Sequence, residues 1–261
     1  MFDYHVHSFI SPDAENKFEE IVQGAIAHGV REVCITDHDE SGSDFCTIDM
    51  ERYNREYQAF LATNPGIPVK KGIELSVHYD VIPLYEAFLA KNEFDFVIAS
   101  QHFVDGMDLY LPDFYQDKTV HEAYRRYLEA MLKTLSHFTD YDVVGHIGYC
   151  CKYCGNYKKL PFEYDLFPDL FDEILKTVIK NGKGIELNTS AGRLTGGIGA
   201  PTPGILKRYR ELGGEILTIG SDGHRPGEVS YGISQGVAAL KELGFSYLCT
   251  FDKRKPTFHK I

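Results

Sequence analysis

The sequence contains no apolar stretch that approaches the length of a membrane-spanning helix, and its first residues lack the basic and apolar runs of a secretion signal. We therefore expect a cytoplasmic protein with no membrane partner. Basic residues are also in the minority, since 27 Lys and Arg stand against 38 Asp and Glu, for a formal net charge of −11. This balance, and the lack of a basic run with interleaved aromatic residues, argues against a nucleic-acid partner.

Only 6 cysteines are present, and without a secretion signal we expect them to be reduced. Cys151-Lys152-Tyr153-Cys154 has the spacing of a zinc ribbon or a redox pair, but no second pair exists to complete a tetrahedral site. We therefore interpret Cys150, Cys151 and Cys154 as loop cysteines without a catalytic or metal-binding role.

Hydrophobic residues make up 43% of the 261 residues, which is enough for a sizeable core, and no change of composition marks a linker. We expect one domain over residues 1–261. The apolar pattern predicts strands near residues 2–5, 32–36, 69–75, 94–99, 142–144, 184–187 and 215–220. It predicts helices near residues 16–28, 48–62, 84–91, 120–138, 166–181, 203–212 and 229–243. Residues 245–251 are expected to form either a short eighth strand or an edge extension.

Strands and helices alternate at the spacing of βαβ units, which predicts an α/β barrel or a doubly wound open sheet. The position of the polar residues separates the two folds. Histidine or acidic residues stand at or just beyond the end of each strand: His5, His7, Asp37 to Asp39, Glu74, His102, His146, Glu186, Asp222 and His224. Strand ends form one rim in a barrel, whereas an open sheet would scatter them along an edge. We therefore predict a barrel with a site on this rim.

The first of these strands carries the strongest local signal. Two residues apart on an extended chain, His5 and His7 point to the same face and converge on one point. Asp13 follows after a short turn that allows it to reach the same place. Imidazole and carboxylate ligands without thiolate suit Zn, Fe or Mn. One catalytic zinc needs about three protein ligands, so the full set predicts two or three divalent metal ions with open positions for water and substrate.

Several short motifs carry a resemblance to a known family: His5-x-His7, Thr36-Asp37-His38, Gly72-Ile73-Glu74, His102, Gly145-His146 and Ser221-Asp222-Gly223-His224. Together they resemble the polymerase-and-histidinol-phosphatase (PHP) superfamily along nearly the whole chain. Within it the sequence is most similar to the standalone histidinol-phosphate phosphatases. The resemblance implies a single distorted (β/α)7 TIM-like barrel with a trinuclear metal centre, and hydrolysis of L-histidinol phosphate to L-histidinol and phosphate in histidine biosynthesis.

The resemblance also implies a ligand set. The first metal would be held by His5, His7, Glu74 and Asp222, with Glu74 bridging to a second metal at His102 and His146, and Asp13, His38 and His224 would hold the third. Asp13 stands where many members of the superfamily carry histidine. Asp13 and His38 would therefore either hold the third metal or, with that site empty, donate a proton to the leaving alkoxide.

The expected reaction is an in-line attack on phosphorus by a hydroxide that bridges two metals. Arg193, which follows the sixth predicted strand, is our candidate for binding the phosphoryl oxygens, because arginine bonds phosphate bidentately. Lys158, Lys159 and Arg225 are weaker candidates. Glu186 either points towards the metals or orients a ligand histidine from behind.

Other functions remain open at this point. Members of the same superfamily cleave phosphate esters in nucleotides, nucleic acid or phosphotyrosine proteins with similar metals. A non-catalytic, metal-stabilised module of a larger assembly is the alternative from another class. The complete ligand set favours an enzyme, and a panel of phosphate esters would separate the substrates.

Overall fold

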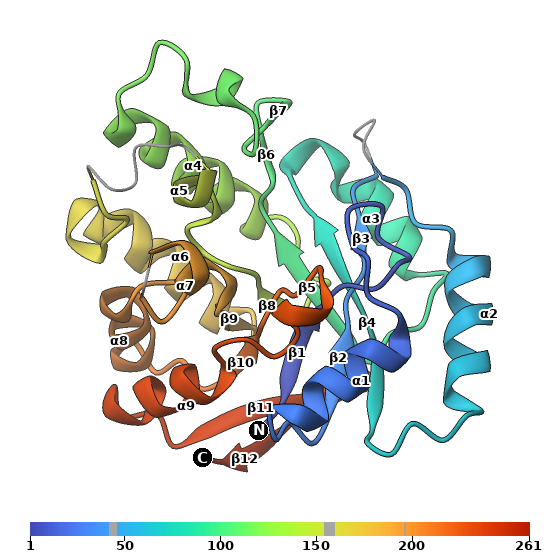
Figure 1. Ribbon diagram of the computed structural model, residues 1–261. Helices are drawn as coiled ribbons and strands as arrows, with labels where there is room; N and C mark the ends of the chain where they lie inside the picture. Colours follow the sequence, from blue (N-terminus) through green and yellow to red (C-terminus); the bar gives the residue numbers. More distant parts are fainter. Residues whose placement is uncertain (42–45, 154–159, 196) are drawn as a thin grey trace.

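A parallel sheet that curves into a nearly closed barrel forms the centre of the computed structural model, which describes residues 1–41, 46–153, 160–195 and 197–261 (Figure 1). Its strands follow chain order: β1 (Asp3–Val6), β2 (Val33–Ile35), β4 (Val69–Ser76), β5 (Phe96–Ser100), β8 (Val143–Val144), β9 (Gly184–Asn188) and β10 (Leu217–Gly220). Neighbouring strands pair in parallel. The predicted α/β barrel is therefore confirmed.

The barrel closes where its first and last strands meet. Val6, at the end of β1, forms a parallel bridge with Gly223, just beyond β10. Asp3 reinforces the closure from the start of β1. Its buried carboxylate accepts hydrogen bonds from the backbone N–H and the hydroxyl of both Ser221 and Ser230. The seam thus brings the two ends of the site-bearing sequence together.

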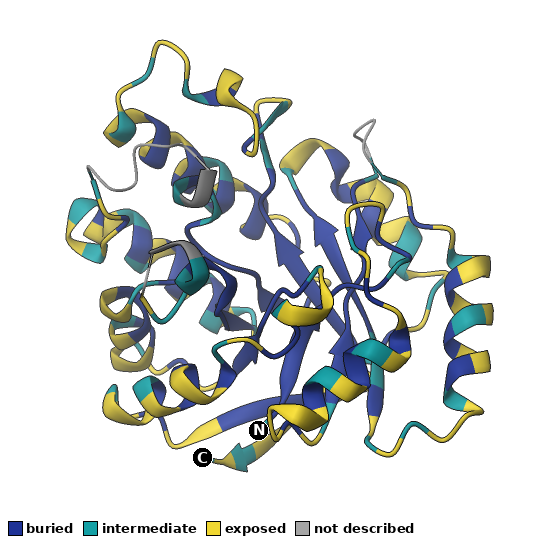
Figure 2. Cartoon of the chain, in the orientation of Figure 1, coloured by how far each residue is buried: buried dark blue, intermediate teal, exposed yellow. Residues whose placement is uncertain are grey.

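Amphipathic helices cover the outside of the barrel, with their apolar faces inward and their polar faces exposed (Figure 2). They are α1 (Phe18–Ala27), α2 (Met50–Leu61), α3 (Ile82–Leu89), α4 (Val120–Leu135), α6 (Pro168–Lys180), α8 (Pro203–Glu211) and α9 (Ile233–Glu242). Helix α4 begins with a capping box, in which Thr119 and Glu122 each bind the other's backbone N–H. Each predicted helix is present, with its ends shifted by a few residues.

A C-terminal hairpin covers the end of the barrel where the strands begin. Strand β11 (Tyr247–Asp252) pairs antiparallel with β12 (Lys255–Lys260). The Tyr4 hydroxyl accepts a hydrogen bond of 2.9 Å from the Phe251 N–H. A separate apolar cluster fills the junction: Phe2, Tyr4, Cys34, Phe96, Ile98, Val143, Cys249 and Phe251. The segment forms a strand as expected, but this strand pairs with β12 and not with a strand of the barrel, so the expectation of an eighth barrel strand or an edge extension was wrong.

Several short elements lie at the opposite end, beyond the C-terminal ends of the barrel strands. They are β3 (His38–Asp39), β6 (Phe103–Val104), β7 (Met107–Asp108), α5 (Tyr149–Tyr153) and α7 (Ser190–Thr195), with single turns at Tyr79–Val81, Pro112–Tyr115, Tyr164–Leu166 and Pro226–Glu228. None of these was predicted. Within the described ranges, no helix has the length and apolar character needed to cross a membrane.

Candidate metal centre

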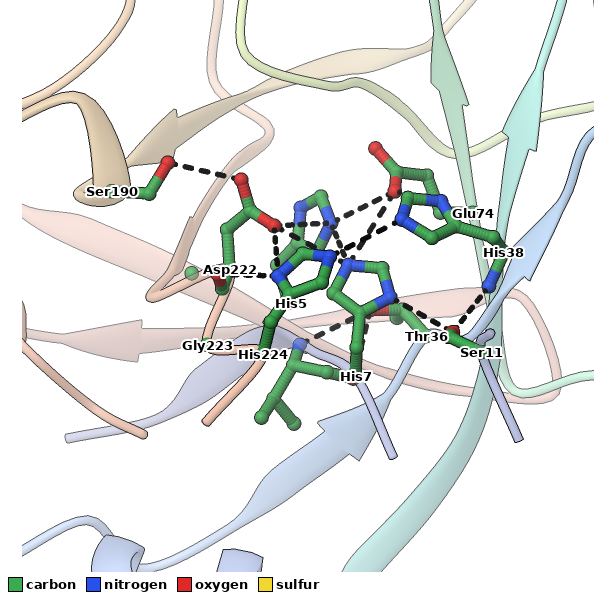
Figure 3. Close-up of polar contacts among 12 residues, drawn as sticks. His5, His7, Ser11, Thr36, His38, Glu74, Ser190, Asp222, Gly223 and His224 are labelled. Atoms are coloured by element: carbon green, nitrogen blue, oxygen red, sulfur yellow. Dashed lines mark hydrogen bonds and ion pairs between the residues drawn. The ribbon is translucent and has the colours of Figure 1, made fainter. Parts of the chain in front are cut away.

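The nine residues predicted to bind metal lie together at the C-terminal end of the barrel. They are His5, His7, Asp13, His38, Glu74, His102, His146, Asp222 and His224. Figure 3 shows His5, His7, His38, Glu74, Asp222 and His224 pointing toward one another. All except Asp13 and His224 are buried. The parallel register explains part of this convergence, since His38 on β3 is the direct partner of Glu74 on β4. The structure thus brings together side chains separated by up to 219 positions (224 − 5).

The histidines face one another in pairs through their Nε2 atoms. These nitrogens are 3.1 Å apart in His5 and His7, 3.3 Å apart in His102 and His146, and 3.3 Å apart in His38 and His224. Two tetrahedral ligands at zinc–nitrogen distances of 2.0–2.1 Å are separated by about 3.3 Å. The three pairs therefore have the spacing of ligands that share a metal ion.

Glu74 stands between these pairs and touches more than one of them. Its Oε1 lies 2.8 Å from His146 Nε2 and accepts a 2.6 Å hydrogen bond from the Ser100 hydroxyl. Its Oε2 lies 3.2 Å from His5 Nε2 and 2.9 Å from His38 Nδ1. Glu74 Oε2 and His38 Nδ1 are both buried and have no hydrogen-bond partner among the described residues. Such orphaned polar atoms fit a metal-bound state.

Asp222 completes the set from the last strand. Its Oδ1 lies 3.3 Å from His7 Nε2, and its Oδ2 accepts a 2.9 Å hydrogen bond from the Ser190 hydroxyl. Its backbone has φ of 51°, a left-handed conformation that aspartate adopts more readily than most residues. Two residues earlier, Gly220 leaves space for β1, since a Cβ there would lie 2.2 Å from the Cβ of His5.

Asp13 is the most exposed member, with 41% of its side chain accessible, and lies at the mouth of the site. Its Oδ2 is 3.3 Å from His224 Nε2 and 3.8 Å from His38 Nε2. Burial by itself would raise its pKa, but both imidazoles outweigh that effect and hold the pKa of the Asp13 carboxyl below its ordinary value. Asp13 is therefore an anion at neutral pH.

Two buried glutamates contact the Nδ1 atoms of two candidate ligand histidines. Glu186 Oε1 lies 2.7 Å from His5 Nδ1, and its Oε2 accepts a hydrogen bond of 3.0 Å from the His146 N–H. Of the two roles considered for Glu186, the geometry therefore favours orienting a histidine. Glu40 does the same for His102, with 2.7 Å between Oε1 and Nδ1. The sequence analysis missed Glu40, whose only signal was its place at the end of the acidic run that contains His38.

The carboxylates change the protonation of these histidines. Burial alone would lower the pKa of His102, but the negative charge of Glu74 and the hydrogen bond to Glu40 raise that pKa to about 10. His5 behaves alike, since Glu186, Glu74 and Asp222 outweigh its burial and raise its pKa well above the ordinary value. Both imidazoles are thus protonated at neutral pH in the metal-free protein.

We expect metal affinity to rise with pH for this reason. A metal has to displace the protons on His5 and His102, and fewer protons compete as the pH approaches their raised pKa values. Affinity should increase up to about tenfold per pH unit for each proton released. Chelator competition across neutral to mildly alkaline pH measures the metal affinity. Calorimetry in two buffers of different ionisation enthalpy measures the number of protons released. A pH-independent affinity without proton release would contradict this expectation.

A cavity of about 510 Å³ opens above the cluster. Its lining combines the centre with rim residues: Asp13, His38, Glu40, Glu74, His102, Asp108, Tyr110, His146, Tyr149, Ser190, Arg193, Asp222, His224, Arg225 and Glu228. Arg193, on α7, donates hydrogen bonds of 3.1 and 3.3 Å to the carbonyl oxygens of Ser221 and Asp222. It also lies 3.6 Å from Glu228. The predicted phosphoryl-binding arginine therefore borders the cavity, while Arg225 is the more exposed of the two.

The segment after the fifth predicted strand is described only in part. Lys158, Lys159 and Cys154 lie outside the described residues. Within the described part of the chain, neither Cys150 nor Cys151 belongs to a group with the spacing of metal ligands. The expectation that they lie in a loop was wrong, since both stand on α5 and Cys150 is buried in the core. That they have no catalytic or metal-binding role stays a prediction.

Comparison with known proteins places this geometry in context. The PHP domain family matches residues 3–190, so Asp222 and His224 lie beyond that match. The histidinol-phosphatase of Lactococcus lactis is 31% identical over 97% of this chain and 95% of its own. A protein of Clostridium acetobutylicum, named "Probable histidinol-phosphatase", is 29% identical over 86% of each chain. The crystal structure of the Lactococcus lactis histidinol phosphate phosphatase, with zinc, L-histidinol and phosphate, covers 98% of both chains with a TM-score of 0.86 and 29% identity.

Proposed function

This chain belongs to the PHP domain family, and from that premise we propose that it is a metal-dependent phosphatase that hydrolyses L-histidinol phosphate to L-histidinol and phosphate. One observation carries the substrate. A relative that matches nearly the whole chain, with a TM-score of 0.86, was crystallised with zinc and both reaction products. A cytoplasmic location is part of the proposal, and cell fractionation tests it.

Three groups of residues would hold the metals. The first is His5, His7 and Asp222, the second is His102 and His146, and the third is Asp13, His38 and His224, with Glu74 shared between the first two. The paired histidines and the orphaned oxygen of Glu74 support this division. When bound, divalent metals lower the pKa of water towards neutrality to supply a hydroxide nucleophile, and they draw charge from phosphoryl oxygens.

Arg193 is assigned to the phosphate. Its guanidinium has five N–H donors, more than its two hydrogen bonds to carbonyl oxygens use. Those bonds fix the plane of the guanidinium beside the cavity. An ordered, positively charged donor stabilises the charge that develops on the equatorial oxygens during phosphoryl transfer.

Asp13 is assigned to the third group as a ligand. Because its pKa lies below the ordinary value, its carboxylate carries no proton to give to a leaving alkoxide at neutral pH. His38, whose pKa is raised by Glu74 and Asp13 against the opposing effect of burial, is the better proton carrier when no metal occupies that group. Of the two roles considered for Asp13 and His38, we therefore assign metal binding to Asp13 and keep proton donation for His38 alone.

A panel of phosphate esters tests the substrate. We expect L-histidinol phosphate to give the highest kcat/KM among L-histidinol phosphate, nucleoside monophosphates, a phosphotyrosine peptide and p-nitrophenyl phosphate. Chelation should abolish turnover of every ester, and added metal should restore it. Preference for a nucleotide or the phosphotyrosine peptide would reject the proposed substrate while keeping the metal chemistry. Turnover that survives complete metal removal would reject the metal chemistry itself.

A further inference from the structure

A buried carboxylate outside the proposed ligand set accepts hydrogen bonds from the loop that carries His7 and Asp13. Asp37 is fully buried at the end of β2 and accepts four hydrogen bonds from two serines. Ser8 contributes its N–H at 2.7 Å and its hydroxyl at 2.6 Å, and Ser11 contributes its N–H at 3.2 Å and its hydroxyl at 2.7 Å. Burying a carboxylate is costly unless it is fully hydrogen-bonded, and here the bonds all come from one short loop.

The Ser11 hydroxyl links this carboxylate to the centre. The Ser11 hydroxyl donates its hydrogen bond to Asp37. Its oxygen still has two lone pairs that can accept hydrogen bonds, and two groups lie within hydrogen-bonding distance. The His38 N–H donates at 3.0 Å, and His7 Nδ1 lies 3.3 Å away. A hydroxyl that already donates elsewhere accepts from His7, which places the proton of the neutral imidazole on Nδ1.

This tautomer has a direct consequence for the metal site. With its proton on Nδ1, His7 presents an unprotonated Nε2, the atom that faces His5 Nε2 at 3.1 Å and Asp222 at 3.3 Å. A histidine binds a metal only in its neutral form. Ser11 thus selects the tautomer of His7 that leaves Nε2 available to the metal.

We propose that Asp37 and Ser11 are positioning residues for the reaction, which act as a carboxylate–hydroxyl–imidazole chain that fixes the tautomer and orientation of His7 towards its metal. The inference rests on the metal site of the proposed function but not on its substrate. Glu186 and Glu40 reach His5 and His102 directly. His7 is held through a serine because the carboxylate of Asp37 lies one side chain further away.

The serines supply a matched pair of variants. Ser11→Ala removes the acceptor for His7 Nδ1 and for the His38 N–H, whereas Ser8→Ala removes a hydroxyl bond to the same carboxylate without touching a histidine. Loss of a partner behind a metal ligand typically weakens metal binding by about 10–100-fold. We expect that loss in Ser11→Ala and Asp37→Asn, and metal affinity within about threefold of wild type in Ser8→Ala.

The readouts separate positioning from stability. Zinc affinity and stoichiometry are measured by chelator competition on folded protein, and ¹⁵N imidazole spectra of the metal-free protein report the tautomer of His7. Asp142→Asn serves as a control for a buried carboxylate at the other end of the barrel, where Asp142 pairs with Arg254. It should lower the melting temperature and leave zinc affinity unchanged.

The outcomes are distinct. Equal zinc affinity in Ser11→Ala and Ser8→Ala, or an unchanged His7 tautomer in Ser11→Ala, overturns the inference. If Asp37→Asn does not fold, the serine pair alone decides. Selective loss of zinc affinity in Ser11→Ala supports the inference even if the wild-type protein fails to hydrolyse L-histidinol phosphate, a result that would reject only the proposed function.

Discussion

Replacing Glu74 with glutamine is expected to lower kcat/KM for any phosphate ester by roughly 10³-fold and to release bound metal. Glutamine keeps the shape but turns one carboxylate oxygen into an amide that donates towards an imidazole, and it removes a charge shared by His5 and His146. A 10³-fold loss corresponds to about 4 kcal/mol, which is similar to the loss of stability of about 3–5 kcal/mol that follows removal of one partner of a buried ion pair.

Kinetics and metal analysis on the same preparation measure the effect of Glu74→Gln. Two metals should be weakened together, because the carboxylate lies against histidines of two groups. Glu86→Gln, on the exposed face of α3, is the matched control and should leave both quantities unchanged. Loss of a single metal with the other retained at full affinity would show that Glu74 is not shared.

The second large effect is expected at Arg193. Its replacement by alanine should lower kcat/KM by about 10²–10³-fold, the scale of losing one preorganised donor to the transition state. Lysine should restore only part of this activity, since it keeps the charge but loses the planar fork. Because Arg193 also bonds the carbonyl oxygens of Ser221 and Asp222, metal content has to be measured alongside turnover.

Arg225→Ala is the comparison for Arg193→Ala. Arg225 borders the same cavity, but it is 60% exposed and pairs with Glu15 and Glu228. Its replacement should therefore have a small effect. Normal turnover in Arg193→Ala, or loss of turnover in parallel with loss of metal, would remove Arg193 from the residues that bind phosphate.

It could be predicted that the residues of the centre lie close together, because the topology of the barrel places them on one rim. Parallel strands of a barrel end on one rim, so a polar residue at each strand end, such as Glu74 or His146, points to a shared site whatever the loops do. The position of Asp13 could be predicted for a different reason, since its short distance along the chain from His7 limits where it can lie. The barrel itself followed from the alternation of strand and helix patterns.

The supporting contacts were not predictable in the same way. Glu40 reaches His102 and Asp37 reaches Ser11 only because loops from different strands fold over each other at the rim, and spacing along the chain carries no record of that. The hairpin of β11 and β12 was not predicted from the sequence for a related reason. A run of alternating residues indicates a strand but not its partner, and here the partner came from the following segment rather than the barrel.

Because the bridge between Val6 and Gly223 closes the barrel, we expect metal to bind late in folding. Ligands stand on both sides of this seam, from His5 to His224, so no shorter segment contains the full set. Joining chain ends so far apart carries the entropy cost of closing a long loop, and contacts of this kind form slowly. Because metals then bind only the closed barrel, a metal at about 100 times its dissociation constant stabilises that state by about 2.7 kcal/mol. The metal ions would therefore stabilise the closed barrel in addition to their role in the reaction.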